Sequence, residues 1–105
     1  MKTAAEHVAT LPWGDVTLRG IRWRVEDACM DLMIERPGER ESCLRCSWVS
    51  EVRSTLSFAA GPPLTWGADF VRLPGGGWRV RFDFASRGEF EITCDDLALV
   101  HAPGN

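Results

Sequence analysis

The chain has 105 residues, a formal net charge of −3, 45% hydrophobic residues and 26% charged residues, which is the size and composition of one globular domain. The net negative charge argues against a general nucleic-acid-binding protein, whose affinity depends on a basic surface. No apolar stretch reaches the length of a transmembrane helix or of the hydrophobic part of a signal peptide. We therefore expect a single cytoplasmic domain over residues 1–105 that binds neither nucleic acid nor membrane.

The first residues have the pattern of a short helix. Thr3 and Glu6 are spaced as a capping box, in which each side chain accepts a hydrogen bond from a backbone N–H at the helix start. Pro12 ends the helix at or before Leu11, because the residue before a proline avoids the helical conformation. Residues 1–12 are thus predicted to be a short helix and its lead-in, which must pack on the rest of the protein to be stable.

Residues 15–58 are predicted to contain the first strands, beginning with a hairpin. In residues 15–25 the apolar positions change parity at Gly20, which indicates a bulge because glycine tolerates the backbone angles of an extra residue. Residues 29–35 alternate between polar and apolar and form the second strand of the hairpin. The residues expected on its inner face are Met30, Leu32 and Ile34.

The third strand is predicted in residues 43–49. Its apolar side contains Leu44, Cys46 and Trp48. The following residues, 50–58, fit both helical and strand spacing, and their β-branched and polar content favours a strand. Residues 59–67 contain a Gly-Pro-Pro sequence and are predicted to be a loop within the same domain.

Residues 68–100 are predicted to be the C-terminal strands, and residues 78–94 give the clearest signal in the chain. Apolar and charged residues alternate on both sides of a glycine-containing turn, as in an antiparallel hairpin. A three-residue loop at 85–87 keeps the apolar residues on one face and pairs Phe82 with Phe90, whereas a two-residue loop mixes the faces. The apolar face contains Trp78, Val80, Phe82, Phe84, Phe90, Ile92 and Cys94.

These patterns predict a mainly β fold, α+β at the margin. It has six or seven antiparallel strands, in a sandwich-like arrangement or a single curved sheet, and a short N-terminal helix. The order of the strands does not follow from the alternation, which defines only the face on which each residue lies.

Cys43 and Cys46 have the only spacing that belongs to a known chemical motif. A zinc ribbon needs a second close pair, whereas Cys29 and Cys94 each stand alone. Residues three apart in a strand point to opposite faces, so metal binding by Cys43 and Cys46 requires a turn. The favoured interpretation is free thiols in a reducing compartment, with no metal and no cofactor. The alternative is a small metal- or thiol-dependent enzyme that uses this pair.

The five tryptophans divide into two groups. Trp23, Trp48 and Trp78 are in phase with apolar neighbours and are predicted to lie in the core. Trp13 and Trp66 are next to proline or glycine in loop-like sequence, where an exposed indole can anchor a partner. The alternative for these two is that each covers an open end of the core.

Carboxylates are expected to gather on the outer face of the C-terminal hairpin. Asp83, Glu89 and Glu91 all fall on the charged side of the alternation. They can attract a basic partner, because complementary charge steers the encounter of two proteins. The simpler alternative is a solvated surface on which they pair with Arg79 and Arg81.

Four segments together resemble a known group of proteins: residues 11–21, 30–34, 44–49 and 88–94. Their hydrophobic pattern is similar to that of small β-rich bacterial proteins of the toxin-immunity type and related uncharacterised families. The sequence departs from that group at residues 12–15, Pro-Trp-Gly-Asp, where such proteins often carry His-Asp. The resemblance implies a small β-rich fold and a protein partner.

We therefore expect a non-enzymatic cytoplasmic protein-binding module of the inhibitor or immunity type. The residues expected to contact the partner are Trp13, Trp66, Asp83, Glu89 and Glu91. Besides the enzyme that uses the paired cysteines, the other alternative is a structural homodimer joined through a free strand edge or through Trp66.

Overall fold

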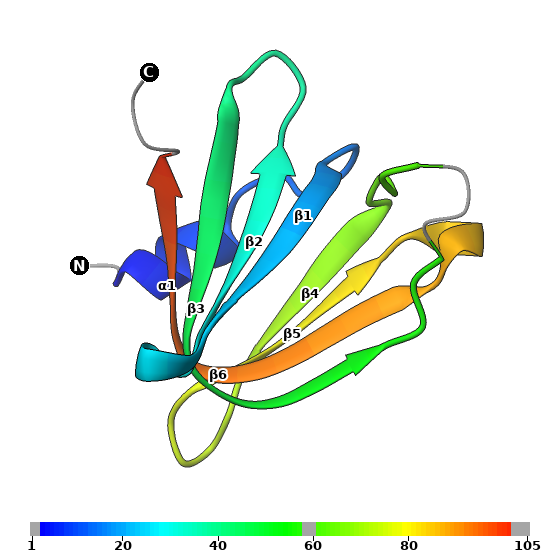
Figure 1. Cartoon of the computed structure of the whole chain (residues 1–105). Helices are drawn as coiled ribbons and strands as arrows, with labels where there is room; N and C mark the ends of the chain where they lie inside the picture. Colours follow the sequence, from blue (N-terminus) through cyan, green and yellow to red (C-terminus); the bar gives the residue numbers. More distant parts are fainter. Residues whose placement is uncertain (1–2, 58–60, 102–105) are drawn as a thin grey trace.

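The computed structural model describes residues 3–57 and 61–101, and in these residues it shows a mainly β fold (Figure 1). The elements in chain order are α1 (Ala4–Ala9), β1 (Thr17–Arg24), the 3₁₀ turn η1 (Val25–Asp27), β2 (Cys29–Glu35), β3 (Glu41–Ser54), β4 (Gly67–Arg72), β5 (Trp78–Asp83), the 3₁₀ turn η2 (Ala85–Arg87) and β6 (Glu89–His101). The strands form one antiparallel sheet in the order β1-β2-β3-β6-β5-β4. The predicted fold class is confirmed, with six strands in a single curved sheet.

The long strands β3 and β6 each run through both halves of a bent sheet (Figure 1). The first half contains β1, β2, the start of β3 and the end of β6, and the second half contains the rest. At the bend Trp48 has a φ of 54°, and the register between β3 and β6 shifts between Val49 and Glu51. An extra residue in one strand increases the local twist and bends it. The inner faces of the two halves therefore face each other and enclose the core.

The C-terminal hairpin has the predicted register. Phe82 pairs with Phe90 and Val80 with Ile92. The Phe84 N–H donates to the Gly88 carbonyl at 2.9 Å, which leaves the predicted three-residue loop, η2, between them. All seven residues of the predicted apolar face are buried, with at most 9% of their surface exposed. Alternation alone was sufficient here because every inward position is apolar and a one-residue register slip would expose all of them.

The N-terminal helix is also as predicted. The Thr3 side chain accepts a hydrogen bond from the Glu6 N–H at 3.1 Å, and the Glu6 carboxylate accepts from the Thr3 N–H at 3.0 Å. Ala5 and Val8 are buried, and α1 packs against β6. Among the described residues, no helix is long and apolar enough to cross a membrane.

The first hairpin is formed by β1 and β2, as predicted, and its bulge lies next to the expected position. The register shifts between Leu18 and Gly20, so the extra residue is Arg19. The ambiguous segment after Val49 continues β3 as far as Ser54, which confirms the preference for a strand there. Residues 55–57 are not in a strand, and the end of the predicted segment, at Phe58, lies outside the described residues.

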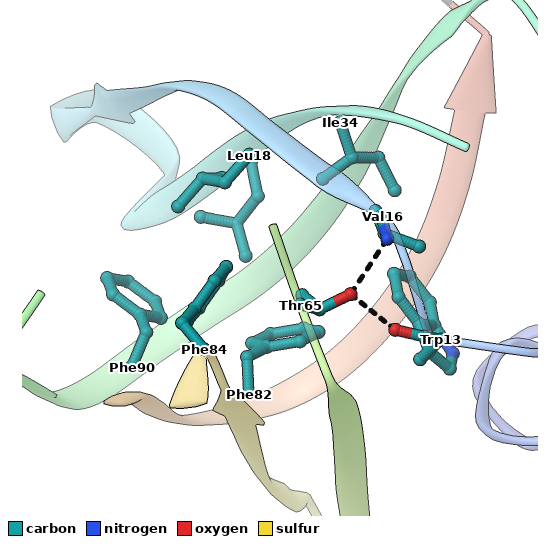
Figure 2. Close-up of a pocket in the computed structure, with 9 residues that line it drawn as sticks. Trp13, Val16, Leu18, Ile34, Thr65, Phe82, Phe84 and Phe90 are labelled. Carbon is teal, nitrogen blue, oxygen red and sulfur yellow. Dashed lines mark hydrogen bonds between the residues drawn. The ribbon is translucent and has the colours of Figure 1, made fainter. Parts of the chain in front are cut away.

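The segment predicted to be a loop before β4 joins the two edges of the sheet. Leu64 bridges to Thr17 at the start of β1. The Thr65 hydroxyl accepts a hydrogen bond from the Val16 N–H at 2.9 Å and donates to the carbonyl of Trp13 (Figure 2). The backbone of Thr65 also pairs with Val16, at 2.8 Å. This segment thus closes the open side of the bent sheet over the core.

Two of the three tryptophans predicted to lie in the core are exposed instead. Trp23 is 48% exposed because β1 is an edge strand, with a neighbouring strand on only one side. Trp48 is 62% exposed because the positive φ at this residue turns its side chain away from the face that Leu44 and Cys46 occupy. The third, Trp78, is buried as predicted.

Candidate functional site

Trp66 has the most exposed large hydrophobic side chain in the described part of the chain, with 77% of its surface open to solvent. It directly precedes β4, and its N–H donates to the Asp83 carbonyl of β5 at 2.7 Å. The backbone is therefore fixed by the sheet while the indole projects into water. Isolated exposed apolar residues are common, but a tryptophan is costly to leave exposed and is enriched at the centres of protein interfaces.

The indole stands beside a shallow surface depression of about 280 Å³, lined by Trp66, Gly67, Ala68, Asp69, Arg81 and Asp83. Arg81 donates to Asp69 at 3.3 Å. The Asp83 carboxylate accepts from the Ala85 N–H at 2.8 Å and has no ion-pair partner among residues 3–57 and 61–101. We call Trp66, Asp69, Arg81 and Asp83 the Trp66 surface.

The other predicted acidic residues lie on the same outer face, further along the sheet. Glu91 and Arg81 are paired residues of β6 and β5, and Glu89 is opposite Asp83 in the same ladder. The Arg81 guanidinium lies 4.0 Å from the Glu89 carboxylate. The structure thus brings Trp66 and Asp83 together and places Glu89 and Glu91 as an acidic rim connected through Arg81.

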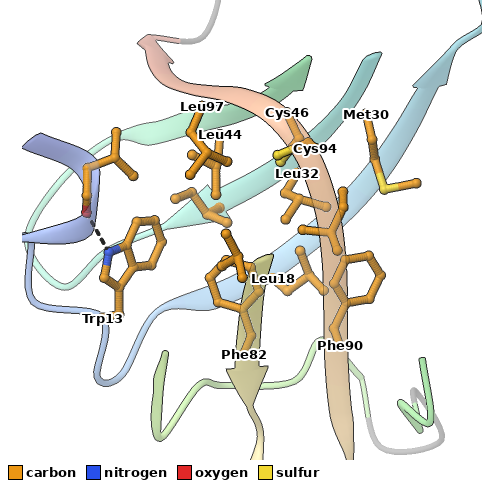
Figure 3. Packing of buried hydrophobic residues seen from close by; sticks show 14 of the residues in the cluster. Trp13, Leu18, Met30, Leu32, Leu44, Cys46, Phe82, Phe90, Cys94 and Leu97 are labelled. Carbon is orange, nitrogen blue, oxygen red and sulfur yellow. Dashed lines mark hydrogen bonds between the residues drawn. The ribbon is translucent and has the colours of Figure 1, made fainter. Parts of the chain in front are cut away.

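The expectation that Trp13 is an exposed contact residue is wrong. Its side chain is 5% exposed, and its Nε1–H donates to the Val8 carbonyl of α1 at 2.9 Å (Figure 3). The ring packs against Phe70 and Phe82, with centroid distances of 5.6 and 5.5 Å. Trp13 therefore covers an end of the core, which was the alternative interpretation, because aromatic residues far away in the sequence fold over it.

Sequence reasoning missed two features of this outer surface. Asp69 belongs to it, and extending the alternation backwards from β5 to β4 would have placed Asp69 opposite Arg81. Several other large apolar side chains are at least one-third exposed: Ile21, Trp23, Val25, Trp48, Val52, Leu64 and Val71. They come from the edge strands, the bend and the turns, where period-two alternation does not report burial.

A buried ion pair lies on the outer face of the other half of the sheet. Asp31 of β2 is 2% exposed, and it accepts hydrogen bonds from Arg45 Nε at 3.0 Å and Nη2 at 3.3 Å. Burial pushes the pKa of Asp31 upward, but the hydrogen bonds and positive charge of Arg45 outweigh it and hold the pKa below its usual value. The pair fixes the pairing of two central strands and has a structural role.

Arg45→Leu is expected to lower the free energy of unfolding by about 2 kcal/mol at pH 7, because Asp31 then remains buried without its partner. This loss of stability is smaller than that expected for a fully buried ion pair, because one-third of the Arg45 side chain is exposed. The lowered pKa of Asp31 gives stability that is present above about pH 4 and lost as the pH falls further. The difference in free energy of unfolding between wild type and variant should therefore be smaller at pH 3 than at pH 7 in urea unfolding experiments.

The matched control is Arg53→Leu, which removes an exposed pair with Glu51. It should change the free energy of unfolding by less than about 0.5 kcal/mol at either pH. Equal effects of the two substitutions at pH 7 would contradict the role of Asp31 and Arg45.

Cys43 and Cys46 lie on opposite faces of β3 and cannot bind one metal ion together. Cys43 is on the outer face, where burial, then the nearby charge of Asp31, raises the pKa of its thiol to about 11. Cys46 is in the core beside Cys94 (Figure 3), and the thiol contact and burial raise the pKa of Cys46 as well. In the described part of the chain, no three potential metal ligands gather. Thiols with raised pKa values are poor nucleophiles at neutral pH.

A cavity of about 10 Å³ lies between the two halves of the sheet (Figure 2). Its lining consists of Trp13, Val16, Leu18, Leu32, Ile34, Thr65, Phe82, Phe84 and Phe90. That volume is about the minimum for one water molecule, and the lining is apolar apart from Thr65, so this cavity is too small for an organic ligand.

Comparison with known proteins found no matching family model, no matching curated protein and no matching solved structure.

Proposed function

We propose that this protein is a non-enzymatic protein-binding module of the inhibitor or immunity type, and that it contacts its partner through the Trp66 surface. The observation that carries the proposal is the exposed indole of Trp66 on a backbone fixed by the sheet. Covering such a side chain removes on the order of 150 Å² of surface from water, which contributes about 4 kcal/mol before the costs of association.

Two further properties of the surface support this proposal. Trp66 adjoins β4 and β5, so only its side-chain rotamer has to be ordered when a partner binds. Asp83 lines the same depression as Trp66, and Glu89 and Glu91 follow on the neighbouring strand β6, so complementary charge on a partner would accelerate the encounter. A rigid aromatic residue beside polar groups is the usual composition of an interface centre.

Trp66→Ala is expected to weaken partner binding at least 30-fold, the loss typical of a residue at the centre of an interface. The free energy of unfolding should change by less than about 1 kcal/mol, because the indole contributes little to the core. The partner would first be identified by crosslinking and mass spectrometry from cells that contain the protein. The affinity of the purified partner for each variant is then measured by calorimetry.

Trp48→Ala is the matched control, because Trp48 is also exposed but lies at the bend of β3. It should bind the partner as the wild type does. Equal losses in both variants, or unfolding of Trp66→Ala, would contradict the proposal. Sedimentation over a range of concentrations tests the homodimer: a constant mass of 11.7 kDa excludes a second copy as the partner.

A further inference from the structure

We infer that the Trp66 surface binds an arginine side chain of the partner protein, with the guanidinium stacked on the indole and hydrogen-bonded to Asp83. This inference rests on the proposed function and adds the chemistry that the surface recognises.

The charges around Trp66 are mainly negative and partly unpaired. Asp83 and Asp69 line the same depression as Trp66. The backbone of Asp15 lies near this surface, because its N–H donates at 2.8 Å to the carbonyl of Thr65, the residue before Trp66. The cation of the surface, Arg81, is already bonded to Asp69. Asp15 and Asp83 make no ion pair within the described residues, so a cation is the group that this surface lacks.

The indole adds a preference for a planar cation. A cation over the face of tryptophan is attracted by the ring quadrupole, by about 0.5–2 kcal/mol depending on solvent exposure. A guanidinium also stacks as a flat group and can donate two parallel N–H bonds to one carboxylate, which an ammonium cannot do. The combination of Trp66 with a free carboxylate therefore favours arginine over lysine, and either of them over an uncharged side chain.

The protein itself contains a cation–π contact at the opposite end of the β4–β5 hairpin. The Arg72 guanidinium at the end of β4 lies 5.8 Å from the ring centroid of Trp78 on β5. On the same two strands Arg81 donates to Asp69. The partner's arginine would combine both contacts, the aromatic one with Trp66 and the ionic one with Asp83.

The test is an NMR titration of the complete protein with the peptide acetyl-Gly-Ser-Arg-Ser-Gly-amide. The matched peptide has citrulline in place of arginine, which keeps the shape and removes the charge. We expect a saturable shift of the Trp66 indole N–H signal with the arginine peptide and at least fivefold weaker binding of the citrulline peptide. Binding should weaken as NaCl is raised from about 50 mM to about 500 mM, because the contact is solvent-exposed.

Variants separate the two parts of the contact. Asp83→Asn should weaken binding of the arginine peptide at least threefold, and Trp66→Leu should weaken it more than Trp66→Phe does, because phenylalanine retains an aromatic face. Trp23→Ala is the control: that exposed indole lies between Arg22 and Arg24 in the sequence, so it should not attract the peptide. Its removal should leave the affinity unchanged.

Equal binding of the arginine and citrulline peptides, or no saturable shift at Trp66, would overturn the inference. If Trp66→Ala still abolished partner binding in that case, the proposed function would stand and the partner would use an apolar group. Stronger binding of a lysine peptide than of the arginine peptide would also overturn it. An arginine-specific shift together with normal partner binding by Trp66→Ala would also overturn the inference, because the surface would then bind a cation that does not belong to the partner.

Discussion

Gly88→Ala is expected to lower the free energy of unfolding by about 3 kcal/mol, although it adds a single methyl group. Gly88 has a φ of 112°, a conformation that L-residues with a side chain rarely adopt. A Cβ there would lie 2.4 Å from the Thr55 carbonyl oxygen and 2.8 Å from its carbon. Both are backbone atoms of the neighbouring segment, so the turn and the end of β3 would have to separate. Urea unfolding measures the loss as a lower midpoint.

The matched control is Gly75→Ala in the turn between β4 and β5. A Cβ at Gly75 meets no atom within 4 Å, and its φ is not in the left-handed region. This substitution should change the free energy of unfolding by at most about 1 kcal/mol, in either direction. If Gly88→Ala were as mild as the control, the close approach of η2 and Thr55 would be refuted.

Phe82→Ala is expected to lower the free energy of unfolding by about 4 kcal/mol, because it removes a large buried side chain and leaves a void. Phe82 lies edge-on to Trp13 at 5.5 Å and to Phe70 at 6.2 Å, and it lines the interior cavity. Its loss enlarges that cavity and removes support from Trp13. Thermal unfolding should show a correspondingly lower midpoint temperature.

Val71→Ala provides the comparison on the neighbouring strand. Val71 is half exposed on β4 and should contribute less than about 1 kcal/mol. A cost for Phe82→Ala no larger than that of Val71→Ala would mean that the inner face of the hairpin does not form the core.

The parts of the fold that could be predicted best are those that depend on residues close together in the sequence. The register of the C-terminal hairpin and the capping box at Thr3 both follow from side chains within a few residues of one another. Strand order could not be predicted, because alternation tells which face a residue occupies and not which strand lies beside it. The bend in β3 was also missed, since a positive φ at Trp48 has no glycine to mark it.

In the candidate site, too, the residues predicted correctly are those whose exposure follows from the local sequence. Trp66 and Asp83 were predicted from local context, one from its position beside a glycine and the other from alternation. Trp13 has an equally loop-like context, but its burial depends on Phe70 and Phe82, which follow much later in the chain. The bidentate pairing of Asp31 with Arg45 likewise depends on strand register. No single-residue property distinguishes these outcomes beforehand.

The sharing of β3 and β6 by both halves of the sheet has a consequence for folding kinetics. Their ladder joins Ser42 to His101 and Ser54 to Phe90, so it can form only after most of the intervening chain has been brought back on itself. The chain pays the entropic cost of closing this loop before the contacts of the ladder form. Proteins with such a topology are therefore among the slower folders, with folding times of about milliseconds to seconds. Because β3 and β6 each belong to both halves, neither half has all of its strands without the other. The chain should therefore fold in one cooperative step, with formation of the β3–β6 ladder as its rate-limiting event.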